Sequence, residues 1–538
     1  MSIQERFPQA IPAETERIVS GILPGGSVCR LLGERGEQLV NEEALLELYH
    51  REGRGGINPI ILSFVSILQF LEDIPDRQAA EMAVLRMDWK YALRQALTWE
   101  GFHYADLCNF RKRLREGGQT YLIFDQLLEY LRQAGYLKSK RQRTDATHVL
   151  AHIEHLSRLE LVWETIRVAL NGLVSVDAPW VLQWIPASFS SSHSQRRSDY
   201  RLSKAQQEHE MQNAGQEGYW LLGQVAQHGS SRLKAVAEIG LLERVLAEQF
   251  DRSGPDQPTV TVRVEGSACG DVIVSPHDPE ARYSRKNAST EWEGYKAQVT
   301  ESIDGPVPFI TDIGPHSAIE TDNQALTTIQ HRLEARDLRP DQQYVDRAYC
   351  NGATIHLSQQ HQIDLRGYVA QTGNKPPGFR LEDFEIDLDQ RIARCPQGHL
   401  ATVFAPSQQA DVAFHVRFGR QCQACPVRSL CTQERRGRSL EISPYHAELS
   451  QRRQLQRDPD YQQDLQARTR IESTLSELTR RHGLRHCRYC GKCRITLQMV
   501  LAALALNLKR LARYLNPDPV PVSLWFSTMD IDLTFCTV

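Results

Sequence analysis

The first part of the chain shows the apolar spacing of short helices. Asn58 is placed to cap a helix that starts at Pro59, a residue favoured at the first helical position. The apolar stripe of this helix consists of Ile61, Phe64, Leu68 and Leu71. Further helices are predicted over Arg77 to Met87, Tyr91 to Thr98, Ala105 to Arg115 and Tyr121 to Gly135. Residues 1–40 are predicted to be an irregular lead-in. Residues 41–142 form either a DNA-binding unit of the helix-turn-helix kind or a plain helical bundle.

Strand-like patterns begin at residue 143. RTDATHVLAHI, residues 143–153, alternates and is rich in β-branched residues, with Asp145 near its start. Residues 154–258 are helical and polar. Over residues 259–380 strands alternate with helices, one of which places Leu326, Ile329 and Leu333 on its inner side. The predicted strands are PTVTVRVEG, DVIVSP, WEGYKAQVTE, VPFITDI, QYVDRAYC (which holds Asp346) and IDLRGYVA. This pattern predicts a mixed α/β domain interrupted by a helical insertion.

Two helices are predicted in residues 446–516. Leu465, Glu472 and Leu475 stand at i, i+7 and i+10, so Glu472 is expected to face the core with the leucines. A carboxylate in that position needs a cation, and Arg468 or a metal ion would serve. The alternative is a surface Glu472–Arg468 pair. The last helix has the apolar stripe Leu497, Leu501, Leu504, Leu508, Leu511 and Leu515 and is expected to pack on the sheet. Residues 517–538 form an uninformative tail.

Composition and charge narrow the class of protein. A chain of 538 residues with 41% hydrophobic and 24% charged residues is typical of a soluble globular protein with two to four structural units. The net charge of −3 hides a stretch without acidic residues, from Leu478 to Asn516. The basic residues singled out here are Arg480, Arg481, Arg485 and Arg488, with a second block at Arg111, Lys112 and Arg113. Such blocks indicate a polyanion-binding surface or ordinary solvated helix faces.

Cysteine usage and the lack of apolar spans point to the cytoplasm. The N-terminus has no apolar signal segment, and the longest apolar run, from Val500 to Leu508, is too short to span a bilayer. In a reducing compartment the twelve cysteines are expected to be thiols or metal ligands.

The segment 381–445 has the cysteine spacing of a zinc ribbon. Cys395, Cys422, Cys425 and Cys431 would hold structural Zn²⁺ tetrahedrally, and His399 could replace one thiol. The alternative is a set of unligated thiols. A second cluster comprises Cys487, Cys490 and Cys493. It lacks a nearby fourth thiol, and we interpret its members as incidental small residues rather than a metal site.

Three acidic residues form a candidate catalytic set. Asp145 and Asp346 on strands and Glu472 on a later helix are the oxygen ligands that two hard divalent cations need. Two such ions, roughly 3.5–4 Å apart, can activate a water or a 3′-hydroxyl for phosphoryl transfer. Many other acidic residues of the chain fit no such pattern.

The order of these motifs resembles a known family. RTDATHVLA, GYKAQVTE, YVDRAY, the cysteine ribbon, RTRIESTLSELTRRHGLRHCRYCGK and LALNLKRL together are similar to bacterial insertion-sequence transposases of the DDE class, nearest to the group named after insertion sequence 1182. The resemblance covers about residues 40–515. It implies an RNase H-like mixed-sheet catalytic core with a helical insertion, a cysteine-ribbon insertion and an N-terminal all-helical DNA-binding domain. It also implies that Asp145, Asp346 and Glu472 bind two Mg²⁺ ions, with Mn²⁺ as an alternative.

The resemblance further implies a function and its partners. The protein would bind the terminal inverted repeats of the element, cut the DNA and join the freed end to target DNA, as a homodimer or larger assembly at the nucleoid. Arg468 would touch a phosphate. Leu465 and Thr479 stand where a related signature has tyrosine and lysine, which leaves those two auxiliary roles open. The alternatives are an inactive transposase that only binds DNA, and a metal-dependent nuclease without strand transfer.

Overall fold

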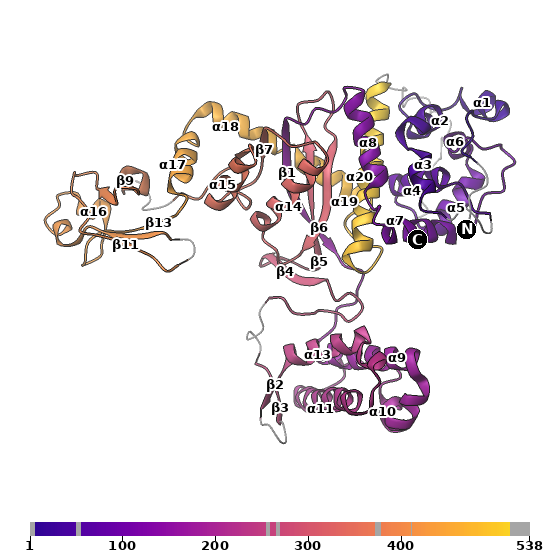
Figure 1. Ribbon diagram of the computed structural model, residues 1–538, viewed down its shortest axis with the longest axis horizontal. Helices are drawn as coiled ribbons and strands as arrows, with labels where there is room; N and C mark the ends of the chain where they lie inside the picture. Colours follow the sequence, from indigo (N-terminus) through magenta and orange to yellow (C-terminus); the bar gives the residue numbers. More distant parts are fainter. Residues whose placement is uncertain are drawn as a thin grey trace, which may run out of the picture.

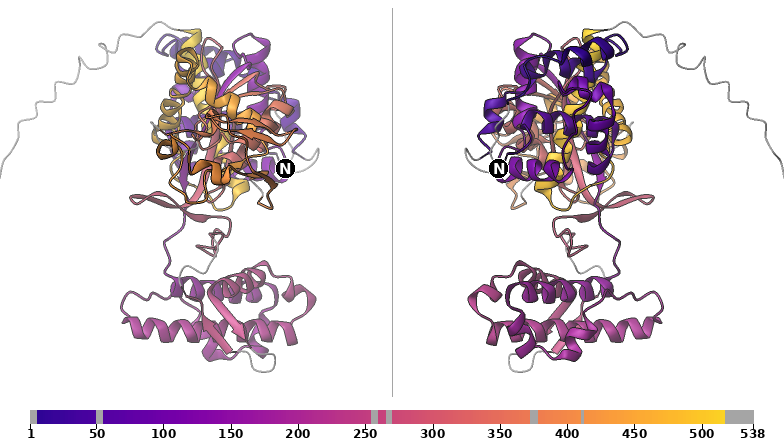
Figure 2. Two further views of the ribbon diagram at one scale, coloured as in Figure 1. Left: turned by 90° about the vertical axis from the view of Figure 1, so that its left-hand side faces the viewer. Right: turned by 90° about the vertical axis from the view of Figure 1, so that its right-hand side faces the viewer.

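The computed structural model describes residues 6–49, 55–253, 259–264, 270–371, 378–409 and 412–516. A central sheet lies between an N-terminal helical unit and a cysteine-rich unit, and a helical insertion projects from the sheet (Figure 1). Views from both sides show the insertion set apart from the rest of the chain (Figure 2).

The N-terminal unit consists of helices only. These are α1 (Ala13–Val19), α2 (Val28–Leu39), α3 (Glu42–Leu46), α4 (Pro59–Glu72), α5 (Asp76–Leu85), α6 (Met87–Ala92), α7 (Ala105–Glu116) and α8 (Leu122–Gln133). The predicted start of α4 is confirmed, because the Asn58 side chain accepts a hydrogen bond of 2.9 Å from the N–H of Ile60.

Two predictions for this unit are wrong. Residues 6–40 are not irregular, since they contain α1 and α2, and α2 packs on α6. The helix predicted from Tyr91 to Thr98 is instead α6, which ends at Ala92. Arg94 follows with a φ of 51°, and its buried guanidinium donates to backbone carbonyls including that of Gly33. This tertiary contact ends the helix where the local pattern predicted its continuation.

The central sheet contains six strands. They are β1 (Arg141–Leu150), β4 (Arg282–Asn287), β5 (Thr290–Ser302), β6 (Ile310–Ser317), β7 (Gln342–Tyr344) and β8 (Asp364–Arg366). β5 pairs antiparallel with β1, β4 and β6, whereas β1, β7 and β8 are parallel. The main part of the sheet thus runs β6-β5-β1-β7-β8. The predicted strand DVIVSP is wrong: no strand lies between Asp271 and Pro276, where Ile273 packs into the core of the insertion.

Helices cover both sides of the sheet. α14 (Asp322–Ala335) and α15 (Gly352–Gln360) lie on one side, and α19 (Ile471–Arg481) and α20 (Lys492–Leu515) on the other (Figure 1). Among the described helices, α20 alone is long and apolar enough to cross a membrane, but most of it is buried. It packs between β6 and α4 and so is the core helix that joins the sheet to the N-terminal unit.

The helical insertion has a hydrophobic core of its own. It comprises α9 (Arg158–Trp184), α10 (Ala187–Ser192), α11 (Lys204–His228), α12 (Ser231–Lys234), α13 (Ala237–Gln249), β2 (Phe250–Ser253) and β3 (Thr259–Val262). The buried side chains of Trp163, Leu221 and Leu242 belong to this core and not to that of the sheet.

The cysteine-rich unit consists of short strands around a small core. Its elements are η1 (Leu381–Asp383), β9 (Glu385–Asp387), β10 (Ile392–Arg394), β11 (Val403–Pro406), β12 (Phe414–Arg417), η2 (Gly419–Cys422), α16 (Arg428–Cys431) and β13 (Ser439–Ile442). The chain returns to the sheet through α17 (His446–Leu455), α18 (Pro459–Leu465) and the short 3-10 helix η3 (Gln466–Arg468).

Candidate active site beside β1 and β7

Asp145 lies on β1, and Asp346 lies in the turn that follows the neighbouring parallel strand β7. β1 and β7 pair in the register Arg141 with Gln342 and Arg143 with Tyr344. β7 ends at Tyr344, so Asp346 lies two residues past the strand, and the prediction that it lies on the strand is wrong. Its charge acts on the Asp145 carboxylate. Both aspartates are only partly exposed. Burial, helped by the Asp346 carboxylate, raises the pKa of Asp145 to about 6, against the lowering effects of the Ala146 N–H and the Arg468 guanidinium.

The turn that carries Asp346 is fixed by buried contacts. The Asp346 carboxylate accepts a hydrogen bond of 2.7 Å from the N–H of Ala348. Tyr349 is fully buried and its hydroxyl donates to the side-chain oxygen of Gln298 on β5. Thr354 donates to the Tyr349 carbonyl at 2.8 Å, which ties the turn to α15. The position of Asp346 therefore depends on the packing of the sheet.

Glu472 reaches the same site from α19, with Arg468 between the carboxylates. Arg468 Nη1 lies 3.2 Å from Asp145 Oδ2, and Arg468 Nη2 lies 3.7 Å from Glu472 Oε1. The structure thus brings Asp145 together with Asp346, and Asp145 together with Glu472 through this arginine.

The expectation that Glu472 faces a core is wrong. Its side chain is 69% exposed, in the first turn of α19. Leu465 belongs to α18, and the chain passes through η3 before α19 begins at Ile471, so the seven-residue spacing does not lie on one continuous helix. The first turn is a favourable place for a carboxylate, because the helix dipole is positive there.

A buried network holds α19 against the sheet. Glu301 on β5 is fully buried and pairs with Arg143 of β1 at 2.6 Å and with Arg510 of α20 at 2.9 Å. Thr474 of α19 donates to the same carboxylate at 2.8 Å. One side chain thus links β1, α19 and α20, the elements that carry or flank Asp145 and Glu472.

The three carboxylates are suitable ligands for hard divalent cations, but they are not arranged around a common metal position. Their oxygen atoms are the donors that Mg²⁺ prefers, and the cation beside them is a guanidinium. Within the described parts of the chain, no group of three or more His, Cys, Asp or Glu side chains is arranged to hold a metal ion.

The sequence analysis did not identify one further carboxylate that lies near this site. Asp322, at the start of α14, accepts hydrogen bonds from Lys296 at 3.2 Å and Gln298 at 3.3 Å. Its charge raises the pKa of Asp145, as a smaller effect than burial. An aspartate in the first turn of a helix is common for reasons of dipole and capping alone, so the pattern could not single it out.

The four predicted arginine clamps divide into two pairs. Arg480 and Arg481, at the end of α19, are exposed. Arg485 donates to the His148 carbonyl of β1 at 2.7 Å. Arg488 donates to the Ile74 carbonyl at 2.7 Å and pairs with Asp73 at 2.5 Å. The second pair thus anchors the chain, and the first is the one open to a phosphate.

The basic block on α7 divides in the same way. Arg111 is buried and paired with Asp76, which gives it a packing role inside the N-terminal unit. Lys112 is exposed, 3.7 Å from Glu116. Arg113 lies over the ring of Tyr49 at 4.7 Å.

The cysteines of the predicted ribbon gather in one place. Cys395, Cys422, Cys425 and Cys431 line a cavity of about 20 Å³ together with His399. Burial and the neighbouring thiols raise the pKa of Cys431, against the lowering effect of Arg438. The described residues include no closed metal-binding group, so structural zinc stays a prediction.

The second cysteine cluster shows no common centre. Cys487 is buried, the Cys490 thiol lies 3.9 Å from the His152 carbonyl, and Cys493 is exposed.

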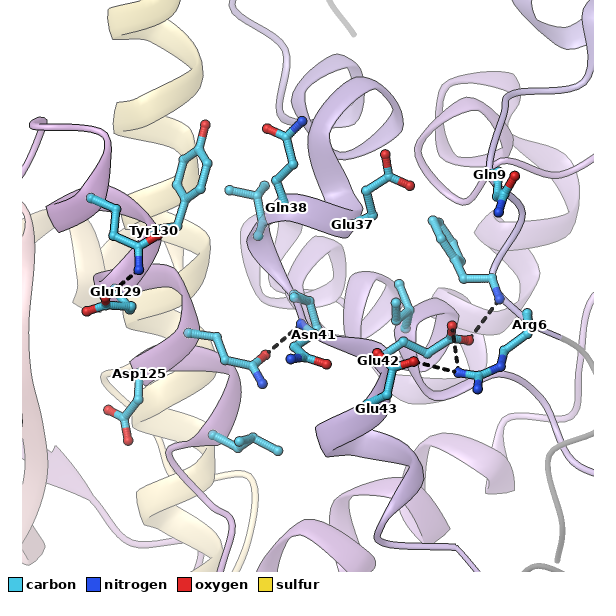
Figure 3. Close-up of a pocket in the computed structure, with 17 residues that line it drawn as sticks. Arg6, Gln9, Glu37, Gln38, Asn41, Glu42, Glu43, Asp125, Glu129 and Tyr130 are labelled. Carbon is cyan, nitrogen blue, oxygen red and sulfur yellow. Dashed lines mark hydrogen bonds and ion pairs between the residues drawn. The ribbon is translucent and has the colours of Figure 1, made fainter.

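A cavity of about 860 Å³ lies elsewhere, in the N-terminal unit (Figure 3). Its acidic lining includes Glu37, Glu42, Glu43, Asp125 and Glu129, and Arg6 pairs with Glu42 and Glu43 at 3.3 Å. None of the predicted site residues lines it. Its negative charge disfavours a nucleic acid.

Comparison with known proteins identifies two parts of the chain. A family model described as a transposase DDE domain matches residues 394–512, which include Glu472, Arg468, Arg480 and Arg481. A second model, described as a transposase domain (DUF772), matches residues 24–113. No curated protein and no solved structure matches the chain. The chain thus matches a transposase family model on each side of its mixed α/β core, a combination typical of transposases of the DDE class.

Proposed function

We propose that the protein binds the terminal inverted repeats of an insertion sequence and catalyses Mg²⁺-dependent DNA cleavage and strand transfer. The observation that carries this proposal is the gathering of three carboxylates: Asp346, in the turn after β7, acts on Asp145 of the adjacent strand β1, and Arg468 joins Asp145 to Glu472. The strand order β6-β5-β1-β7-β8 is in line with an RNase H-like core.

The three carboxylates would hold two divalent cations. When bound, these ions would activate the attacking water or 3′-hydroxyl and stabilise the leaving oxygen. The chain holds its own ligands in place: Tyr349 ties the turn of Asp346 to β5 and α15, and Glu301 secures α19 through Thr474. Partial burial of Asp145 strengthens its electrostatic interactions with a bound cation.

The exposed basic residues supply contacts to DNA. Arg480 and Arg481 lie in the last turn of α19, whose first turn carries Glu472, so they would bind phosphates about two helical turns from the reacting bond. Lys112 and Arg113 would contribute from the N-terminal unit. Because these contacts neutralise phosphates, DNA affinity should fall steeply with salt. Synapsis of two element ends would need at least a homodimer, in the bacterial cytoplasm at the nucleoid.

Carboxylate variants test the proposal. Asp145→Asn, Asp346→Asn and Glu472→Gln should each lower Mg²⁺-dependent cleavage of a plasmid carrying the element ends by about a hundredfold or more, with end binding retained. The matched control is Glu477→Gln, on the same helix but paired with Lys509 at 2.6 Å, which should keep most activity. A triad variant that still cuts would remove that residue from the site.

The products separate the competing functions. Cleaved and joined products support a transposase, cleaved products alone indicate a nuclease without strand transfer, and binding without cleavage indicates an inactive transposase that acts as a DNA-binding protein.

A further inference from the structure

The guanidinium of Arg468 occupies the space between two of the three carboxylates. It is 24% exposed and contacts the partly buried Asp145 at 3.2 Å and the exposed Glu472 at 3.7 Å. Among the described residues, no other basic side chain forms an ion pair with either carboxylate. The arginine thus compensates both charges in the absence of a metal ion.

The arginine and a divalent cation would need the same oxygen atoms. A divalent ion binds carboxylate oxygens at about 2.0–2.6 Å, which leaves no room for a guanidinium between them. The contact with Glu472 is long and largely solvated, and such pairs contribute little free energy. Release of Arg468 is therefore a small cost compared with the gain from direct ligation.

The main chain beside Arg468 is held while its side chain can move. Arg143 donates to the carbonyl of Ala467 at 2.8 Å, and Arg143 is itself locked by Glu301. Rotation of the long Arg468 side chain would break only its two ion pairs and leave η3 in place.

We propose that Arg468 competes with the divalent cation for Asp145 and Glu472 and is released when the metal binds, which frees it for a DNA phosphate. This inference rests on the proposed function, because it takes Asp145 and Glu472 as metal ligands. It assigns Arg468 opposite effects in two steps: the side chain weakens metal binding and promotes cleavage.

Mn²⁺ binding to the full-length protein tests this inference without any catalysis. Free Mn²⁺ is measured by electron paramagnetic resonance in titrations of the wild type, Arg468→Gln, Arg468→Lys and Asp145→Asn. Arg470→Gln is the matched control, because Arg470 is exposed, lies two residues away and carries the same charge.

The inference predicts tighter Mn²⁺ binding by Arg468→Gln, by about three- to tenfold. Arg470→Gln should differ from the wild type by less than about twofold, as expected for a screened surface charge. Arg468→Lys should bind Mn²⁺ with intermediate affinity. Cleavage by Arg468→Gln at saturating Mn²⁺ should be slower than that of the wild type, a split that a merely structural role would not produce.

Two failures can be told apart. If Arg468→Gln binds Mn²⁺ no more tightly than Arg470→Gln while Asp145→Asn weakens binding, the competition is overturned and the proposed metal site stands. If Asp145→Asn leaves Mn²⁺ binding unchanged, the proposed function itself fails. Should Arg468→Gln not fold, a Lys variant that binds Mn²⁺ more weakly than the wild type overturns the inference.

Discussion

At the scale of single residues, the site places a carboxylate where it is costly to the fold. Asp145 is 17% exposed and its pKa is raised to about 6, mainly by burial. The folded chain therefore holds a proton on this side chain up to about pH 6, well above the usual pKa of 3.8. Stability from this group falls as the pH rises from about 4 to 6, because the folded state binds more protons than the unfolded state over that window.

Asp145→Asn should accordingly stabilise the protein at neutral pH. The neutral amide removes the burial cost of the charge, which we expect to raise the free energy of unfolding by about 1–3 kcal/mol after loss of the Arg468 pair. Urea denaturation of the variant and the wild type at pH 7 measures this difference in the free energy of unfolding. Glu472→Gln, at an exposed position, should change stability by less than about 0.5 kcal/mol. A destabilised Asp145→Asn variant would show that the ion pair outweighs the cost of burial.

At the scale of elements, the turn after α19 joins the site to the N-terminal unit. His482 lies with Nδ1 3.1 Å from the Phe70 carbonyl of α4. Gly483 follows with a φ of 66°, and a Cβ at this position would collide with the Asp73 carboxylate. Asp73 also holds Arg488. The backbone conformation thus favours glycine, and an added Cβ would also displace the Asp73 carboxylate from its pair with Arg488.

Gly483→Ala should destabilise the protein by about 2–4 kcal/mol, as the sum of backbone strain and the steric conflict with Asp73. Gly118→Ala is the matched control, since Gly118 has a similar φ of 69° and open space around its Cα. It should cost only the backbone strain, about 1–2 kcal/mol. The difference in the free energy of unfolding between the two variants measures the steric conflict with Asp73. Equal destabilisation of both variants would contradict that conflict.

At the scale of the whole molecule, the chain combines parts with separate cores. The insertion between β1 and β4 has its own cluster of buried side chains, and it projects away from the sheet (Figure 2). The contacts that tie it to the sheet side include the pair of Glu164 with His277 at 2.6 Å. The N-terminal unit, in contrast, shares one continuous core with the sheet and α20.

This difference predicts how fragments behave. The fragment 154–277 should be helical by circular dichroism and unfold in one cooperative transition, because it keeps the whole core of the insertion, Ile273 included. The fragment 6–135 should not unfold in a cooperative transition, because α4 loses α20 as a packing partner. A cooperative 6–135 fragment, or an unfolded insertion, would contradict this division.

The sequence predicted features that depend on near neighbours. The Asn58 cap, the buried face of α14 at Leu326, Ile329 and Leu333, and the strand around Asp145 all follow from local chemistry or periodicity. The predicted orientation of the Glu472 side chain was wrong, because the apolar spacing does not reveal the break between α18 and α19.

The sequence could not predict which basic residues are exposed. Burial of Arg111 depends on Asp76, and the anchoring of Arg488 depends on Asp73, more than four hundred residues earlier. Such long-range pairs are set by the tertiary fold, and no local pattern distinguishes Arg488 from Arg480.

The position of α20 in the core determines when the N-terminal helices can complete their packing during translation. This helix is translated after the elements between which it packs, β6 on one side and α2, α4, α7 and α8 on the other. The earlier helices therefore keep an apolar face uncovered until α20 has been made. A product terminated before Lys492 would expose that face to chaperones and proteases, so that interrupted translation yields degradation rather than a DNA-cutting fragment.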